Sequence, residues 1–366
     1  MSNCRIIAFY LPQYHPIELN NKYYGEGFTE WTNVKKATPL YKDHYQPKVP
    51  ADLGYYDLRD AETREKQAEM AKEAGIEGFC YYHYWFGKGH EELEYPFEQV
   101  VKMKKPDFPF CLCWANQSWY AKFWSKDKTK TTMPIAEQIY DDEEWNKKHF
   151  ESLLEAFKDE RHIRVDGKVL FMIYRPLEYP GVEEFMKQWQ KLAKENGFEF
   201  YFVGQSVNDE DAQKVLALGF DGVNVVRKDD FLKEKEYNNA FSNFKNKVMR
   251  ALGCAPYHYE YKNVYKYFIH KDGLEKQNNI FPTLLPNWDH SARSGKKAVI
   301  FDNPAPEYFK EHLVETIKTV EHKRDEEKII FLKSWNEWGE GNYVEPDARY
   351  GRGYLDVLKE CVANKK

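Results

Sequence analysis

Short apolar runs alternate with helical patterns along most of the chain. Eight runs have the length and the β-branched and aromatic content of strands. They cover Arg5 to Leu11, Glu77 to Phe86, Phe108 to Asn116, Lys168 to Pro176, Glu199 to Ser206, Gly222 to Val226, Asn279 to Trp288 and Lys328 to Trp338. The runs are continuously apolar rather than alternating, which predicts strands buried on both faces, as in a parallel sheet covered by helices.

Helical patterns fill most of the gaps between these runs. The first ends at Gly75, a residue that accepts the left-handed conformation of a helix stop. The patterned stretches are 57–75, 142–158, 182–197, 209–219, 239–253, 305–322 and 351–366. The repeated strand–helix order, without a dividing linker, predicts an α/β fold with one domain over residues 1–366, a single (β/α)8 TIM barrel. A doubly wound sheet is the alternative, but no Gly-rich phosphate-binding turn follows the first run.

A long loop, Pro12 to Tyr56, follows the first predicted strand. Loops of this length with little structure of their own are usually functional or disordered, and the aromatic content of this one argues against disorder. We expect it to cover the barrel mouth, with Glu30 and Trp31 as substrate contacts. The alternative for Glu30 is a structural salt bridge in a packed rim.

Charge and hydropathy narrow the classes of partner. The formal net charge is −5, which makes a phosphate backbone a poor partner, so we expect no nucleic acid. No apolar stretch approaches the ~20 residues of a membrane span. The first residues lack a secretory pattern, which predicts a cytoplasmic protein unless a leader has been trimmed. The six cysteines form no disulfide framework, and Cys111 and Cys113 are expected to be buried thiols rather than metal ligands.

Aromatic residues make up 17% of the chain, and many stand where a predicted strand ends. Barrel enzymes carry their chemistry at the carboxyl ends of the strands. Aromatic platforms beside polar groups suit a carbohydrate, although any one of these residues alone is more typical of packing. With Glu30 and Trp31, the predicted contacts of an oligosaccharide or polysaccharide are Tyr10, Gln13, Tyr14, His83, Trp85, Trp114, Asn116, Trp288, Asp289, Trp335 and Asn336.

The stretch "SWNEWGEGNYVEPDARYGRGYL", from Ser334 to Leu355, follows the last predicted strand. Glycosidic chemistry needs two carboxyl groups near the anomeric carbon, and Glu337 and Glu340 stand at the right end of that strand. Neighbouring tryptophans supply apolar walls that raise a carboxyl pKa. Glu345 is expected to have a structural or supporting role.

Other chemistries fit the sequence less well. There is no G-x-S-x-G turn, no paired nucleophilic cysteine, no H-E-x-x-H motif and no phosphate loop. A metal site built from His15, His83 and Asp289 is conceivable, but their spacing gives it no support. We therefore expect neither a metal nor a cofactor.

Several blocks of the sequence resemble the WbsX-type proteins, which are similar to glycoside hydrolase family 99 and often carry a lipopolysaccharide-biosynthesis or glycosyltransferase label. The blocks span nearly the whole chain and include "AFYLPQYHP", "GFTEWTNV", "QPKVPADLGYYDLRD", "GFCYYHYWF", "CWAN", "IRVDGKVLFMIYRP", "WDHSAR" and "WNEWGEG". The resemblance implies a (β/α)8 barrel related to endo-α-1,2-mannosidases. It also implies retention of configuration through a 1,2-anhydro sugar, with Glu337 as the base for the 2-OH and Glu340 as acid and then base. Tyr10, Trp114 and Asn336 are implied sugar contacts.

Two departures from the family pattern bear on the sugar. Gln117 stands where relatives often carry an acid, and "RKDDFLKEKEYNN", residues 227–239, lacks the expected pattern. The sequence thus predicts a retaining glycoside hydrolase, endo-acting on an α-linked, mannose-like glycan. Two alternatives are a glycosyltransferase or transglycosylase of surface-polysaccharide assembly, and a carbohydrate-binding barrel without catalysis.

Overall fold

The parallel sheet closes on itself, because β1 pairs with both β2 and β14. The computed structural model describes residues 4–120, 134–140, 142–252, 254–270 and 273–362. Eight parallel strands form the barrel, and each matches a predicted run, so the TIM-barrel prediction is confirmed. They are β1 (Arg5–Tyr10), β2 (Gly78–Gly87), β4 (Phe110–Trp114), β8 (Lys168–Ile173), β9 (Phe200–Ser206), β10 (Gly222–Val225), β12 (Ile280–Leu284) and β14 (Ile329–Leu332).

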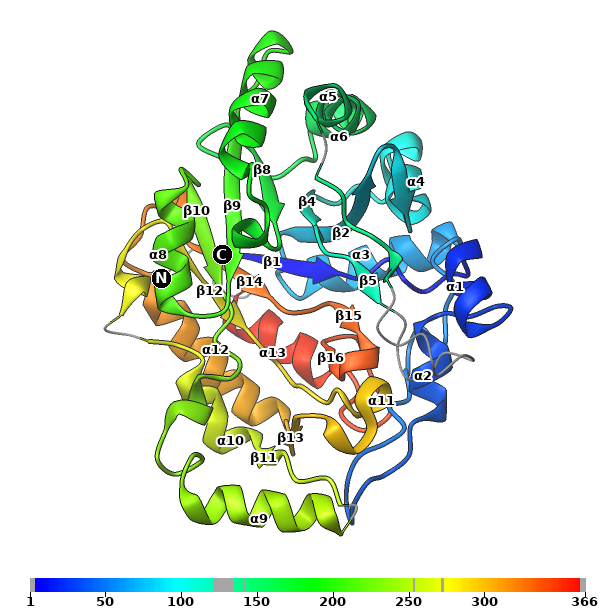
Figure 1. The fold of residues 1–366 in the computed structure, drawn as a ribbon, viewed down its shortest axis with the longest axis vertical. Helices are drawn as coiled ribbons and strands as arrows, with labels where there is room; N and C mark the ends of the chain where they lie inside the picture. The colour runs from blue at the N-terminus through cyan, green and yellow to red at the C-terminus, as the bar shows by residue number, and fades with distance from the viewer. Residues whose placement is uncertain (1–3, 121–133, 141, 253, 271–272, 363–366) are drawn as a thin grey trace.

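Helices surround this barrel and connect most successive strands (Figure 1). The first, α3, begins where the Asp60 side chain accepts hydrogen bonds from two backbone N–H groups, and the chain leaves it through Gly75 at φ 85°. The surrounding helices are α3 (Ala61–Glu73), α4 (Tyr95–Met103), α5 (Glu143–Ser152), α6 (Leu154–Lys158), α7 (Val182–Glu195), α8 (Asp209–Ala217), α12 (Pro306–Val320) and α13 (Gly353–Cys361). None of the described helices is long and apolar enough to cross a membrane.

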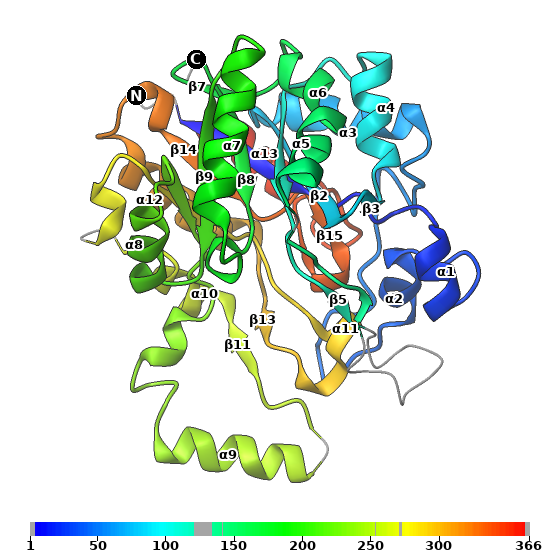
Figure 2. The ribbon, with the colours of Figure 1, turned by 45° about the horizontal axis from the view of Figure 1, so that its top comes forward.

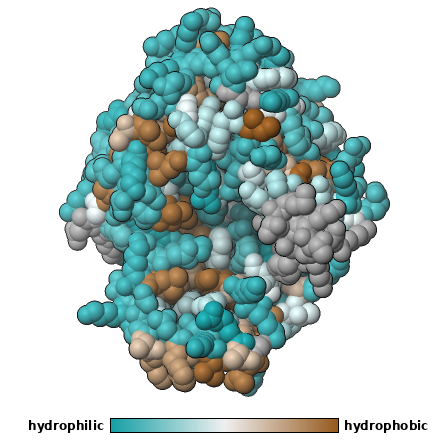
Figure 3. Space-filling model, in the orientation of Figure 1, coloured by the Kyte–Doolittle hydropathy of each residue, from teal (hydrophilic) through white to brown (hydrophobic). Residues whose placement is uncertain are grey.

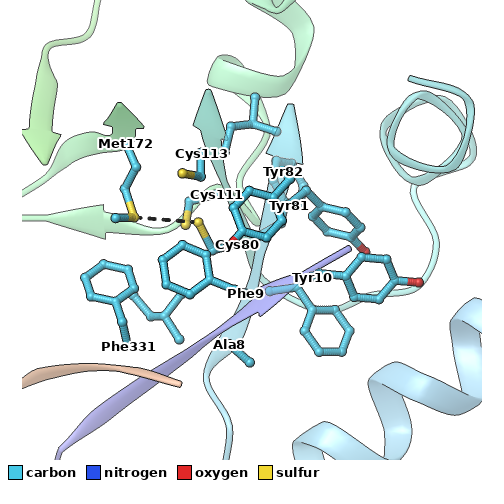
Figure 4. Close-up of a cluster of buried hydrophobic side chains, with 14 of the residues drawn as sticks. Ala8, Phe9, Tyr10, Cys80, Tyr81, Tyr82, Cys111, Cys113, Met172 and Phe331 are labelled. Atoms are coloured by element: carbon cyan, nitrogen blue, oxygen red, sulfur yellow. Dashed lines mark hydrogen bonds between the residues drawn. The ribbon is translucent and has the colours of Figure 1, made fainter. Parts of the chain in front are cut away.

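Successive side chains of each strand point alternately into the barrel and out toward the helices. Figure 4 shows Phe9 beside Tyr82 inside the barrel, with the two rings stacked at 5.4 Å, and Tyr10 beside Tyr81 on the other side of the strands. The thiols predicted to be buried are buried, and Cys80 donates to the Met172 sulfur at 3.7 Å. This alternation decides which strand residues reach the site.

Shorter elements extend from the barrel. They are α1 (Glu18–Tyr24), α2 (Glu30–Lys36), α9 (Ala240–Ala251), α10 (Tyr261–Val264), α11 (Ser291–Ser294), β3 (His90–Glu92), β5 (Trp119–Tyr120), β6 (Pro134–Ala136), β7 (Arg164–Val165), β11 (His258–Glu260), β13 (Ile300–Asp302), β15 (Asn336–Glu337) and β16 (Asn342–Tyr343). The long loop after β1 is more ordered than predicted, because it contains α1 and α2. The last barrel strand is shorter than predicted: it ends at Leu332, and Trp338 lies in the 3-10 turn η8 (Trp338–Glu340).

A separate lobe projects from the barrel between β10 and β12. It holds α9, β11 and α10, and β11 pairs in parallel with β13 from the connection that follows β12. A second apolar cluster, which includes Phe231, Tyr261 and Phe301, lies under this lobe. The stretch 239–253 was predicted as a barrel helix. Figures 1 and 2 instead show α9 at the edge of the molecule, away from the sheet, and none of its residues is buried.

Candidate active site

A cavity of about 890 Å³ opens at the carboxyl ends of the barrel strands. Its wall includes residues at or just after the ends of seven strands, while the loop after β1 and the projecting lobe supply further parts. The residues from the strand ends are Leu11, Tyr82, Tyr84, Ala115, Tyr174, Arg175, Gln205, Val226, Lys333 and Glu337. The site therefore lies where the barrel fold predicts it.

The turn after β14 brings both glutamates to this cavity. The Glu337 backbone N–H donates to Ser334 Oγ at 3.0 Å, and the chain then tightens through η8 to Glu340. Gly339 leaves room for the side chains of Glu30 and Arg293, because a Cβ at this position would collide with the Glu30 carboxylate. Gly341 follows with φ 55°, a left-handed conformation that suits glycine.

One guanidinium holds three carboxylates together. Arg293, in α11, places Nη1 2.5 Å from Glu340 Oε1 and 3.5 Å from Glu337 Oε1. Its Nη2 lies 3.0 Å from Glu30 Oε2. The side chain of Arg293 is only 13% exposed, so these charges interact with little screening by solvent. The predicted salt bridge of Glu30 is thus present, and Glu30 lines the cavity as well.

The two glutamates differ in their electrostatic surroundings. Burial, together with the negative charge of Glu340, raises the pKa of Glu337 to about 7. Burial opposes ionisation of Glu340 too, but Arg293 and His290 outweigh it and hold the pKa of that carboxyl below its ordinary value. Glu337 is therefore close to half protonated at neutral pH, whereas Glu340 is ionised. This is the reverse of the acid and base roles that the family resemblance implies.

Lys333 provides a second cation beside the pair. It follows β14 directly, donates to Tyr82 Oη at 3.0 Å and places Nζ 3.9 Å from Glu337 Oε2. Glu337 Oε2 has no hydrogen-bond donor among the described residues. Burial opposes the charge of Lys333, but Glu337 raises the pKa of this ammonium above its ordinary value. Arg293 and Lys333 thus both lie beside Glu337.

Sequence reasoning missed both cations. The signal for Arg293 was the block "WDHSAR", and the signal for Lys333 was its place immediately after the last barrel strand. The sequence alone does not indicate which carboxylate either cation contacts. Arg293, for example, lies 44 residues before Glu337.

Five of the predicted site residues line the cavity: Gln13, Glu30, Trp288, Glu337 and Glu340. The Trp288 ring lies beneath Lys228 Nζ, 4.6 Å from its centroid. The other predicted contacts do not line the cavity. They are Tyr10, Tyr14, Trp31, His83, Trp85, Trp114, Asn116, Asp289, Trp335 and Asn336.

Strand alternation turns the predicted β2 residues away from the cavity. His83 and Trp85 pack against His149 of α5. Tyr82 and Tyr84, which alternate with them along β2, point into the barrel and line the cavity. Tyr10 and Trp114 also lie outside the cavity. Tyr10 donates to Gln67 of α3 at 2.6 Å, and Trp114 packs on Phe185 of α7.

The predicted amides hold strand ends together. Asn336 accepts from the Leu11 N–H and donates to the Leu11 carbonyl, and Asn116 makes the same pair of bonds with Arg175. Asp289 accepts from Gln46 at 2.7 Å, and its N–H donates to the Glu340 carbonyl at 2.7 Å. These side chains fix the loops that carry the catalytic candidates.

The remaining predicted aromatics form a packed layer behind the turn. Tyr14 donates to the Asn336 carbonyl at 2.5 Å, and its ring lies against Trp31 at 4.6 Å. Trp31 also contacts Trp338, and Trp335 packs on Phe79. A layer of this kind stiffens the turn that presents Glu337 and Glu340.

Glu345 lies in a different buried environment. Its carboxylate accepts hydrogen bonds from Tyr56, Gln67 and Trp338 at 2.9, 2.7 and 2.6 Å, and it does not line the cavity. Its place behind the turn supports the structural role that the sequence suggested. In the described part of the chain no group of three or more His, Cys, Asp or Glu side chains is arranged to hold a metal.

Comparison with protein families gives one match over most of the chain. The profile of the family described as "Glycosyltransferase WbsX" matches residues 6–358. Two curated relatives from Xanthomonas campestris pv. campestris, both called "Uncharacterized protein WxcX", are 29% and 30% identical over 98% of this chain. The alignments cover 49% of each relative, so the chain spans about half of their length.

Solved structures share the fold at low sequence identity. A "Glycoside hydrolase-like protein" superposes with a TM-score of 0.61 at 16% identity, covering 98% of this chain and 94% of its own. A GH99 endo-alpha-mannosidase from Bacteroides thetaiotaomicron superposes with a TM-score of 0.56 at 13% identity, covering 100% and 98%.

Proposed function

Because this chain belongs to the WbsX family, we propose that it is an enzyme that acts on glycosidic bonds. One observation carries the proposal: Glu337 and Glu340 line the cavity and share Arg293, and Glu337 holds its proton up to about pH 7 while Glu340 is ionised. Such a pair supplies the proton donor and the anionic partner that glycosidic cleavage requires. The names of the structural neighbours, a glycoside hydrolase-like protein and an endo-alpha-mannosidase, support this class.

We infer the two roles from the charges around each glutamate. Glu337 gives its proton to the bridging oxygen as the glycosidic bond breaks, which neutralises the leaving group. Glu340 acts on C1, either by direct attack or by taking the proton of the sugar 2-OH so that this oxygen attacks C1. A water molecule then attacks C1 and gives a proton to Glu337, while the bond from C1 to Glu340, or to the 2-oxygen, breaks. In the second case Glu340 returns the proton to the 2-oxygen.

The spacing of the pair supports retention of configuration. Both Oε1 atoms contact Arg293 Nη1, so they can lie no farther apart than the sum of those two contacts, 2.5 and 3.5 Å. This limit applies to one oxygen of each carboxyl group and is below the ~6.5 Å separation at which inverting pairs begin; such pairs leave room for a water molecule between the carboxyl groups. We therefore propose a retaining enzyme.

The cavity suits a glycan longer than one sugar. Its wall combines aromatic rings, among them Tyr84, Trp119 and Trp288, with polar groups that extend to the projecting lobe. Rings give apolar platforms for sugar faces, and polar side chains bond the hydroxyl groups. The proposed substrate is an α-linked, mannose-like glycan, which the enzyme cleaves within the chain.

The test is turnover of α-linked mannose oligosaccharides by matched variants. Glu337→Gln and Glu340→Gln are each expected to lower kcat by a factor on the order of 10³ or more, because each removes one half of the reaction. Glu210→Gln is the control, since Glu210 lines the same cavity and has an 81% exposed side chain. Activity near wild type in either active-site variant, or an equal loss in the control, contradicts the assignment.

Transfer to a sugar acceptor is the second candidate function, because the family description is a glycosyltransferase. The same carboxyl pair serves either reaction, since water and a sugar hydroxyl are both activated by the returning base. Product analysis with and without an added acceptor oligosaccharide separates them. A longer glycan as the main product favours transfer, and a free reducing end favours hydrolysis. Glycan binding without turnover favours a non-catalytic barrel.

A further inference from the structure

The helix α9 shows an apolar face to the surroundings. Phe241, Phe244, Val248 and Leu252 recur every three or four residues, so they share one side of the helix. Their exposed fractions are 76%, 66%, 39% and 74%. Brown and tan atoms gather at the foot of the molecule in Figure 3, where Figure 1 places α9. Surface helices ordinarily turn this side toward a protein core.

A different side of α9 from its apolar face is the least exposed. Ser242, Asn246 and Met249 have intermediate exposure and lie on one stripe, while the residues around them are exposed. The lobe therefore holds α9 by a mainly polar stripe and leaves its phenylalanines uncovered among the described residues.

Cations flank the apolar face. Lys245 and Lys247 border it on its two sides at helical spacing, Arg250 follows, and residues 239–252 contain no acid. This local charge contrasts with the net charge of −5 for the whole chain. Lysines in such positions reach back to a polar boundary while neighbouring apolar side chains are buried.

We propose that α9 binds the surface of an anionic lipid bilayer. A helix with phenylalanine and leucine on one face and flanking lysines lies in the interface of such a membrane, with its apolar face among the acyl chains. Its 12 residues span only ~18 Å, so it lies on the bilayer rather than crossing it. A second copy of the chain fits less well, because two α9 helices face to face bring cations together with no carboxylate between them.

Membrane binding through α9 brings the projecting lobe to the bilayer. The lobe that carries α9 also supplies cavity wall through Lys228, Asp230 and His270. A protein held by α9 is thus attached through a connection that also forms part of the cavity wall. The inference rests on the composition and exposure of α9 and stands whichever reaction the cavity performs.

Vesicle flotation of the full chain tests this inference. Vesicles of phosphatidylcholine mixed with phosphatidylglycerol are expected to carry the wild-type protein at low salt, and pure phosphatidylcholine to carry much less. Phe241→Ser with Phe244→Ser, and separately Lys245→Glu with Lys247→Glu, are each expected to weaken binding about tenfold or more. Since none of the α9 residues is buried, the variants should keep the wild-type circular dichroism spectrum and Tm.

The matched control replaces exposed apolar residues elsewhere. Met103 and Leu177 are 48% and 44% exposed, and Met103→Ser with Leu177→Ser should float as wild type does. Three results overturn the proposal: no flotation of the wild type, equal loss in the control, or a wild-type dimer in light scattering that Phe241→Ser with Phe244→Ser dissociates. The last result assigns the face to a second copy.

Discussion

Glu337 has the surroundings of a group that exchanges a proton near neutral pH. Its pKa is raised to about 7 by burial and by Glu340, so the protonated acid predominates below that pH and is lost above it. If Glu337 is the acid, kcat/KM falls about tenfold per pH unit as the pH rises through 7. Initial rates across pH, measured for wild type and Glu337→Gln, check this.

The variant separates Glu337 from other titrating groups. Glu337→Gln should lack this limb, and an aryl glycoside with a good leaving group should restore much of its rate, because such a group needs no proton. Two results would support the roles that the family resemblance implies, with Glu337 as base and Glu340 as acid. They are a kcat/KM that rises with pH through 7, and recovery of the Glu340→Gln rate, rather than the Glu337→Gln rate, on the aryl glycoside.

Single residues were predictable where they stood in a local motif. Glu337 and Glu340 follow the last strand in "WNEWGEG", so sequence and strand order placed them together. Arg293 was not predicted as a site residue, because its contact with Glu340 depends on how the loop after β12 folds across the turn after β14. The charge pattern of the site is a tertiary property.

At the scale of the element, alternation along β2 decides which tyrosines face the cavity. Tyr82 faces the cavity and accepts from Lys333 at 3.0 Å, whereas Tyr81 faces the other way and packs on Tyr10 and Phe97. Tyr82→Phe is expected to lower kcat/KM about tenfold, since it removes an acceptor from a buried cation. Tyr81→Phe, the control, should leave kcat/KM unchanged. Equal effects in steady-state kinetics would contradict this division.

The elements themselves were largely readable from the sequence. All eight barrel strands and their order follow from apolar runs separated by helical patterns. The inward or outward direction of each aromatic did not, because a continuously apolar strand has no polar side to mark its orientation. The placement of α9 was missed for a related reason: its apolar stripe has the spacing of a core-facing helix, although it faces outward.

At the scale of the molecule, Arg5 of β1 links the segments that lead into β2 and β14, the two strands that flank β1 in the closed barrel. It binds Glu77 before β2 through 2.8 and 2.7 Å contacts and the Glu326 carbonyl before β14 at 2.9 Å. These contacts lie at the amino ends of the strands, away from the cavity. Arg5→Met should therefore lower the free energy of unfolding by about 1–3 kcal/mol and leave KM unchanged.

Chemical denaturation with parallel kinetics checks this prediction. Arg59→Met is the matched control, because Arg59 pairs only with the nearby Asp57 among the described residues and is 53% exposed. Its effect should stay within about 1 kcal/mol. A large rise in KM for Arg5→Met would mean that barrel closure and the site are coupled.

Glu337 and Glu340 share a contact with Arg293, and product stereochemistry tests whether this pair acts with retention of configuration. Proton NMR of the anomeric region follows hydrolysis of an α-linked mannose oligosaccharide before the free sugar equilibrates. We expect the α anomer to appear first, because both Oε1 atoms contact Arg293 Nη1, which brings the carboxyl groups close enough for the double displacement of a retaining enzyme. Initial release of the β anomer would contradict it.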